Sequence, residues 1–110
     1  MFFNSKKFEI VDLTSSNILE VNKTTTLSFY VKDIFKETQI TALSYLPVKK
    51  NGRDELEVGT PISILDLSSD VYKFSYTPTE ASSDFTFRIY ATDADGDEHI
   101  LYIDTYVVKS

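Results

Sequence analysis

The stretch that decides the fold is Phe85-Thr86-Phe87-Arg88-Ile89-Tyr90-Ala91-Thr92. Its odd-numbered residues are apolar and its even-numbered residues are polar or amphipathic, which is the pattern of a half-buried antiparallel strand. The same two-residue alternation occurs before it, over residues 72–76, and after it, over residues 101–108. We expect these three runs to form one antiparallel meander.

Weaker runs of the same period predict further strands. Together they give about seven strands, at Lys7–Leu13, Thr25–Lys32, Gln39–Leu46, Pro61–Leu67, Val71–Thr77, Asp84–Asp93 and Glu98–Val108. The three glycines and three prolines fall between the periodic runs, so we expect no strand to be interrupted by either residue. Asn51-Gly52 predicts a tight hairpin to a short strand near Glu55–Val58, and Asp95-Gly96 predicts the hairpin that joins the last two strands.

The composition favours sheet over helix. Val, Ile, Thr, Phe and Tyr together make 44 of the 110 residues, whereas alanine, the best helix former, occurs four times. A chain of this length fits one domain, residues 1–110. The expected fold is an all-β sandwich, and its core should contain Leu27, Phe29, Val31, Phe74, Phe85, Phe87, Ile89, Leu101, Ile103 and Val107.

The charge of the chain excludes some classes of partner. The formal net charge is −6, and the basic residues are scattered, so the chain is a poor ligand for nucleic acid or for an anionic membrane. It has no cysteine, which removes disulfides, thiol catalysis and thiolate metal sites. No apolar run approaches the roughly 20 residues of a membrane-spanning helix, and we expect no membrane insertion.

The second half of the chain carries a family resemblance. An aromatic strand is followed by Tyr76-Thr77-Pro78, a polar corner, Asp84-Phe85-Thr86-Phe87, the stretch Ala91-Thr92-Asp93-Ala94-Asp95-Gly96 and a final β-branched strand. This order resembles the C-terminal half of bacterial immunoglobulin-like, cadherin-like and PKD-like modules, which occur in tandem in cell-surface proteins. The resemblance implies an immunoglobulin-like β-sandwich of about seven antiparallel strands, although the chain has neither tryptophan nor a cysteine pair.

Members of these groups mostly act as spacers, adhesion modules or accessory domains beside enzymes. The resemblance therefore implies a noncatalytic spacer or interaction module of a bacterial cell-surface or secreted protein. Its partners would be the neighbouring domains of the parent protein, and its export signal would lie upstream of residues 1–7, which have no leader pattern of their own.

Two groups of polar residues are candidates for chemical sites. Asp93, Asp95 and Asp97 surround Gly96 and could approach a calcium ion, but the glycine is misplaced for an EF-hand loop, and we expect a solvated hairpin turn without bound metal. A calcium-stabilised adhesin repeat is the weaker alternative. His99 is the only histidine, and the sequence has no Gly-x-Ser-x-Gly elbow, so we expect no enzyme activity and no cofactor.

Tyrosine gives the main candidate for binding. In the predicted register Tyr90, Tyr102 and Tyr106 face outward, and Tyr45 would join them if its strand lies beside theirs. Tyrosine combines a large apolar ring with a polar tip and suits stacking on a sugar or packing against a protein. The alternative function is thus a carbohydrate- or protein-binding module that uses this face, unless the rings merely cover their own sheet or a register slip turns them inward.

Overall fold

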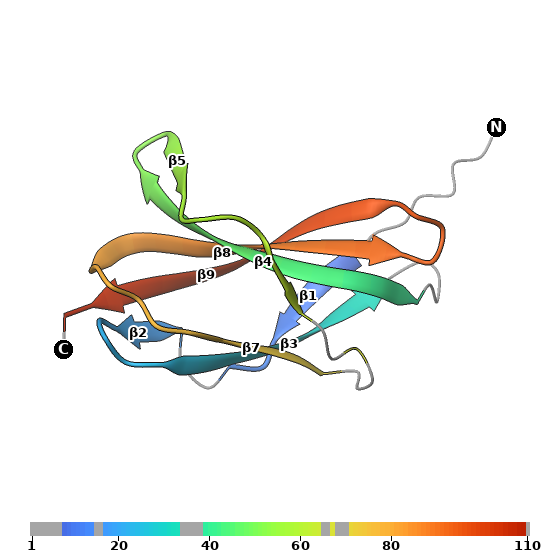
Figure 1. Cartoon of the computed structure of the whole chain (residues 1–110), viewed down its shortest axis with the longest axis horizontal. Helices are drawn as coiled ribbons and strands as arrows, with labels where there is room; N and C mark the ends of the chain where they lie inside the picture. Colours follow the sequence, from blue (N-terminus) through green and yellow to red (C-terminus); the bar gives the residue numbers. More distant parts are fainter. Residues whose placement is uncertain (1–7, 15–16, 34–38, 65–66, 68–70, 110) are drawn as a thin grey trace.

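The computed structural model describes residues 8–14, 17–33, 39–64, 67 and 71–109. They form two β-sheets packed face to face, seen as two layers in Figure 1. In the described ranges the strands are β1 (Phe8–Asp12), β2 (Ile18–Glu20), β3 (Thr25–Asp33), β4 (Ile40–Asn51), β5 (Asp54–Glu57), β6 (Ile62–Ile64), β7 (Tyr72–Tyr76), β8 (Ser82–Asp93) and β9 (Glu98–Val108).

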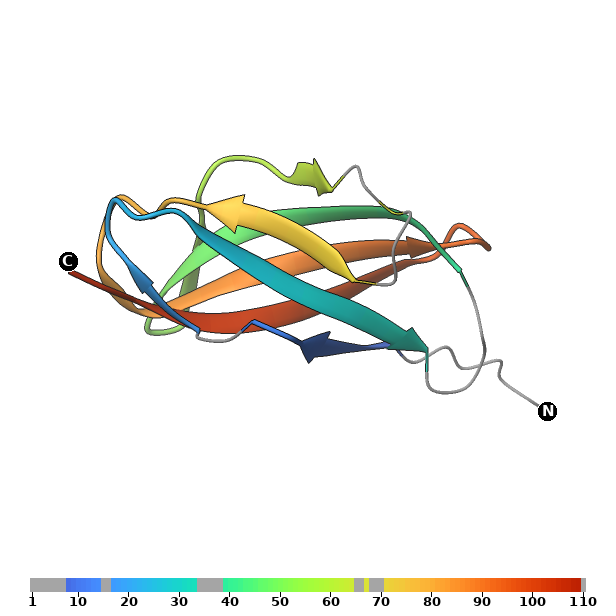
Figure 2. The ribbon, with the colours of Figure 1, turned by 90° about the horizontal axis from the view of Figure 1, so that it is seen from below.

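One sheet has three strands and the other has six. The order is β1-β3-β7 in the smaller sheet and β2-β9-β8-β4-β5 in the larger, where β6 also pairs with β4. Figure 2 shows β3 and β7 crossing in front of the larger sheet. All pairs are antiparallel except β2 with β9, so the N-terminal segment pairs first with β3 and then changes sheet to run parallel to β9. This arrangement confirms the predicted immunoglobulin-like sandwich.

The core lies between the two sheets. Phe85, Phe87, Ile89 and Ala91 of β8 are all buried, as their two-residue alternation predicts, and Phe87 pairs with Ile103 of β9. Eight of the ten predicted core residues are buried, and Val31 and Leu101 are partly buried against them. Eight further buried apolar residues were not predicted to lie in the core: Phe8, Leu19, Ile40, Leu43, Tyr45, Leu46, Val48 and Ile64.

The predicted meander is wrong in its first strand. The β7 strand pairs with β3 in the smaller sheet, with Phe74 opposite Leu27, and only β8 and β9 form a hairpin. Between β7 and β8 the chain passes from one sheet to the other through residues 77–81, where Pro78 is buried. The described ranges hold nine strands. Beyond the seven main runs these include β5, the short strand predicted after Gly52, and β2, which the periodicity did not predict.

Pro47 contradicts the expectation that no strand contains a proline. It lies inside β4, between the segment paired with β6 and the segment paired with β5. Its carbonyl accepts a hydrogen bond from the Val58 N–H (2.9 Å) and therefore points to that edge, away from β8. In an antiparallel strand the N–H and C=O of one residue point to the same side. The N–H that proline lacks would therefore point away from β8, toward the edge where the pairing with β6 ends and the pairing with β5 begins. Its absence removes no hydrogen bond between β4 and β8.

The two predicted hairpins are confirmed. Asn51 pairs with Asp54 around Gly52, whose φ is 65°, and Thr92 pairs with Glu98 around Gly96, whose φ is 88°. Positive φ is the conformation that glycine adopts at least cost, which explains its place in both turns. The predicted strand at Pro61–Leu67 is limited to β6 in the described residues, because residues 65–66 lie outside them. No described helix is long and apolar enough to cross a membrane.

Candidate binding surface

Tyr45 does not lie on the outer face, and this part of the predicted tyrosine surface is wrong. Its side chain points into the core with only 7% of its surface exposed. Its ring stacks on Phe74 of the opposite sheet, and burial raises the pKa of its hydroxyl above the usual 10.0. The outward positions of β4 are instead those that pair with Arg88 and Tyr90, namely Leu46 and Ser44.

The other three tyrosines do lie on the outer face of the six-stranded sheet. Tyr102 is 47% exposed and Tyr106 is 58% exposed, whereas Tyr90 is half-buried. The register places Tyr102 opposite Arg88 and Tyr90 opposite Ile100. The structure therefore brings Tyr90 and Tyr102 onto neighbouring strands and places Tyr106 four residues further along β9.

Tyr90 belongs to a hydrogen-bonded network around Arg88. One guanidinium nitrogen of Arg88, Nη1, donates to the Tyr90 hydroxyl (3.0 Å) and to Oε2 of Glu57 (2.8 Å), and Nη2 donates to Oε2 of Glu55 (3.3 Å). Figure 1 shows β5, which carries both glutamates, bent away from the smaller sheet. The hydrogen bond to Tyr90 raises the pKa of Arg88, as does the bond to Glu57, although desolvation opposes both. The charge of Arg88 is thus already paired with two carboxylates of the same sheet.

Exposed apolar side chains gather along β2 and β9. We call this surface the β9 face, and it consists of Ile18, Ile100, Tyr102, Tyr106 and Val108. Period two over residues 98–108 already places Ile100 and Val108 on the side of the two tyrosines, so this signal was available in the sequence. Ile18 could not be found that way, because it reaches Tyr106 through a parallel pair with a distant segment.

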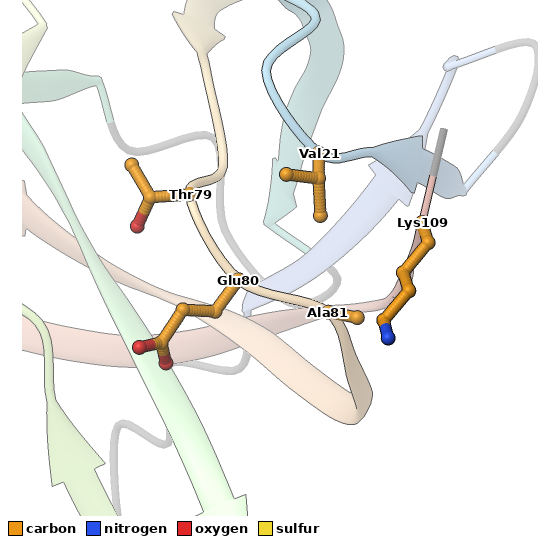
Figure 3. Close-up of a pocket in the computed structure, with 5 residues that line it drawn as sticks. All are labelled: Val21, Thr79, Glu80, Ala81 and Lys109. Carbon is orange, nitrogen blue, oxygen red and sulfur yellow. The ribbon is translucent and has the colours of Figure 1, made fainter.

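A groove of about 450 Å³ lies at one end of the β9 face. Its lining is mostly apolar, and it consists of Ile18, Ala81, Ser82, Ser83, Tyr106, Val107 and Val108. Ala81 also lines a second pocket, shown in Figure 3, with Val21, Thr79, Glu80 and Lys109. In that pocket Glu80 accepts a hydrogen bond from Lys49 (2.8 Å), which lowers the pKa of its carboxyl. The more apolar groove beside Tyr106 is the better place for an apolar side chain.

Asp104 interrupts the apolar row of β9 between the two exposed tyrosines. Its side chain is exposed, and its Oδ1 accepts a hydrogen bond from the Thr86 hydroxyl of β8 (2.9 Å). The same hydroxyl hydrogen is shared with the carbonyl of Ile103, which lies 3.0 Å from the Thr86 oxygen. Within the described ranges the ion pairs of the chain involve Glu20, Glu55, Glu57, Glu80 and Asp93, and Asp104 has none.

The three aspartates of the β8–β9 hairpin have different environments. Asp93 is buried, and its Oδ1 accepts the backbone N–H groups of Asp95 (2.9 Å) and Asp97 (3.1 Å), while Oδ2 lies 2.9 Å from Nε2 of His99. The His99 ring in turn contacts Phe8, with ring centroids 4.2 Å apart. Asp95 and Asp97 are exposed, and no three potential metal ligands cluster among the residues that the structure describes. The Asp93 carboxylate thus organises the turn.

The outer face of the three-stranded sheet is different in character. Small hydroxyl side chains bond across it, as in Thr26 with Ser75 (2.9 Å), and Thr24 bonds to Thr77 (2.6 Å) just beyond the strand ends. None of the exposed large apolar residues in the described ranges belongs to β1, β3 or β7. Exposed apolar surface is therefore concentrated on one side of the sandwich.

No protein-family model matches the sequence, and comparison with curated proteins finds no match. Among solved structures, a cohesin module from a Clostridium perfringens family 33 glycoside hydrolase is 13% identical, with 96% of this chain and 100% of that chain covered and a TM-score of 0.52. The fibronectin(III)-like modules of Clostridium thermocellum CbhA are 13% identical over 93% of this chain and 99% of that chain, with a TM-score of 0.51.

A superoxide reductase (neelaredoxin) from Ignicoccus hospitalis is also similar in structure. It is 8% identical to this chain, with 94% of this chain and 82% of that chain covered and a TM-score of 0.59. The similar structures thus include modules of larger proteins as well as an enzyme. At such low identity these similarities show a shared immunoglobulin-like sandwich and not a shared function.

Proposed function

We propose that this chain is a noncatalytic interaction module of a bacterial secreted or cell-surface protein, and that it binds its partner through the β9 face. One observation carries the proposal. Of the nine large apolar residues exposed in the described ranges, five lie together on β2 and β9, and three of these five are isoleucine or valine. A concentration of exposed apolar side chains with tyrosines is typical of protein interaction sites.

The surroundings of the β9 face favour a recognition role. Thr86 fixes the orientation of Asp104, and the Arg88 network holds Tyr90, so polar groups of defined position border the apolar residues. Interfaces commonly combine an apolar centre with such a polar rim. His99, the only histidine, is hydrogen-bonded to Asp93 within the hairpin, which favours a structural role for it over a catalytic one.

The structural similarities support the proposed setting. The chain resembles a cohesin module, fibronectin(III)-like modules and a Bacteroides thetaiotaomicron lipoprotein, the last with 17% identity and a TM-score of 0.52. These similarities agree with the resemblance of residues 71–108 to modules of bacterial surface proteins. They support the proposal of a module that works beside other domains.

A spacer is the second candidate, because the described chain starts and ends far apart. Phe8 contacts His99 near the start of β9, and Lys109 follows the end of β9, about 30 Å away at roughly 3.4 Å per residue. The described residues span 51 × 32 × 23 Å. Neighbouring domains attached at opposite ends would be held apart along the long axis.

Site-specific photo-cross-linking tests the interaction module. A benzophenone amino acid is placed at Tyr102 in the β9 face or, as a matched control, at Lys73 on the outer face of the three-stranded sheet, in the parent protein in its own cells. We expect one discrete cross-linked product from position 102 and none from position 73. Equal products from both positions, or none from either, would reject a dedicated binding face and leave the spacer.

A further inference from the structure

We propose that the β9 face binds an extended segment of a protein partner that carries a lysine or arginine beside a large apolar residue. The cationic side chain would lie on Asp104 between Tyr102 and Tyr106, and the apolar side chain would enter the groove beside Tyr106. This inference rests on the proposed function and names the chemistry of the partner.

The positions of the three β9 residues come from strand geometry. Tyr102, Asp104 and Tyr106 are alternate residues of β9 and lie on its outward side, about 7 Å apart along the strand. Both tyrosines are about half exposed and Asp104 is exposed between them. A carboxylate flanked by two aromatic rings offers a cation both a charge-assisted hydrogen bond and ring faces.

The carboxylate of Asp104 is oriented but not neutralised by a described residue. The Thr86 hydroxyl occupies one side of Oδ1, and Thr86 is the residue paired with Asp104 across the β8–β9 ladder. The nearest guanidinium in the ladder belongs to Arg88, opposite Tyr102, and it is held by Glu55 and Glu57. A cation from outside is therefore the partner that Asp104 can still accept.

The adjacent groove supplies the apolar half of the site. Its lining starts at Tyr106 and reaches Val108 on β9, with Ile18 beside Tyr106 on β2. This places the groove about two to four residues from Asp104 along an extended strand. A partner segment with a basic residue and a large apolar residue at that separation could contact both at once.

The charge of the surrounding strands favours a basic partner. Residues 82–108 contain six carboxylates and a single arginine. Asp84 and Glu98, like Asp104, are exposed on β8 and β9 and have no ion pair within the described ranges. Complementary charge raises the association rate and disfavours acidic partners, and a cation gains a Coulombic attraction to Asp104 that the hydroxyl groups of a neutral glycan do not.

A random-peptide display library is the probe for this site. We expect peptides selected on the wild-type chain to carry lysine or arginine about two to four residues from a large apolar residue. Asp104→Asn keeps an oxygen for the Thr86 hydroxyl but removes the charge, so it should weaken a selected peptide about fivefold and abolish the preference for basic residues. Tyr106→Ser should instead abolish the apolar preference, while the control Glu9→Gln, an exposed carboxylate on β1 of the other sheet, should change neither.

The outcomes separate this inference from the proposed function. Four outcomes would each reject a cationic partner segment. The selected peptides could lack a basic residue, the basic preference could be unchanged in Asp104→Asn, no peptide could be selected, or the chain could bind a glycan through Tyr102 and no peptide. A cross-link from position 102 that persists despite any of these results would keep the interaction module. A specific cross-link lost in Asp104→Asn, with the selected motif present in the cross-linked protein, would support both.

Discussion

The ring of Tyr45 stacks on the ring of Phe74, with centroids 4.1 Å apart and planes at 17°. Tyr45 belongs to β4 of the larger sheet and Phe74 to β7 of the smaller one, so this pair joins the two layers of the sandwich. Phe87 meets Tyr45 and Phe74 at steep angles, with centroids 6.4 and 5.1 Å away. The three rings form a cluster at the centre of the core.

Removal of the Tyr45 ring should therefore cost much more stability than removal of an outer tyrosine. We expect Tyr45→Ala to lower the free energy of unfolding by about 3–5 kcal/mol, the usual cost of deleting a buried aromatic side chain. The matched control Tyr102→Ala, on the β9 face, should cost less than about 1 kcal/mol. Urea unfolding followed by circular dichroism measures both, and similar losses in the two variants would contradict the inward position of Tyr45.

Burial also makes stability depend on alkaline pH. Burial raises the pKa values of Tyr45 and Tyr76 above 10.0, and the charge of ionised Tyr45 raises that of Tyr76 further. The unfolded chain loses these protons near pH 10 while the folded chain retains them, so this part of the stability is complete below that pH and falls as the pH rises through the folded pKa values.

We thus expect the free energy of unfolding to decline as the pH rises above about 9, and Tyr45→Phe to make the decline shallower. Urea titrations across this range measure the effect. Tyr106→Phe serves as the control because Tyr106 is exposed, and it should keep the wild-type slope. An identical slope in all three proteins would show that burial of Tyr45 does not govern the alkaline limb.

Asp93 should be the most important residue of the β8–β9 hairpin. Asp93→Ala removes a buried acceptor of two backbone N–H groups and the partner of His99, and we expect a loss of about 2–3 kcal/mol. Glu98→Ala, an exposed carboxylate in the same hairpin, should change stability by less than about 0.5 kcal/mol. Equal effects on the urea midpoint would argue against an organising role for Asp93.

Calcium should leave the melting temperature unchanged. The Asp93 carboxylate is already engaged by N–H donors from its own turn, and displacing them would cost the hydrogen bonds that shape the hairpin. Thermal unfolding in calcium and in a chelator measures this. A rise in melting temperature with calcium that disappears in Asp95→Asn would instead support the calcium-stabilised repeat that the aspartate pattern left open.

The sequence predicted the parts of the fold that depend on local alternation. Phe87 and Ile89 were assigned to the core because each is flanked by polar or amphipathic residues, so only one face of β8 could be buried. Gly52 and Gly96 marked the two hairpins because a tight turn depends on a few adjacent residues, and both glycines have the positive φ that such turns require. Leu19 gave no such signal, because β2 has three residues and its burial depends on a parallel pair with β9.

Tyr45 shows why the candidate surface was predicted only in part. Both faces of β4 are apolar, since Leu43 and Tyr45 are buried on one side and Leu46 and Val48 on the other. A strand with two apolar faces does not reveal its register, and a shift of one residue exchanges the faces. Tyr102 and Tyr106 were placed correctly because the residues between them and around them alternate in polarity and size.

The Arg88 network offers a last test, of whether a partly exposed ion pair stabilises the sheet. The Arg88 side chain is 14% exposed and that of Glu57 is 54% exposed, so solvent screens the pair only from one side. A double-mutant cycle of Arg88→Met and Glu57→Gln should give a coupling energy of about 1 kcal/mol. The side chains of the matched pair Lys49 and Glu80 are each more exposed, at 35% and 71%, and should couple more weakly. Equal coupling energies in the two cycles would show that the partial burial of Arg88 does not strengthen its ion pair. They would also contradict the view that Glu55 and Glu57 neutralise its charge.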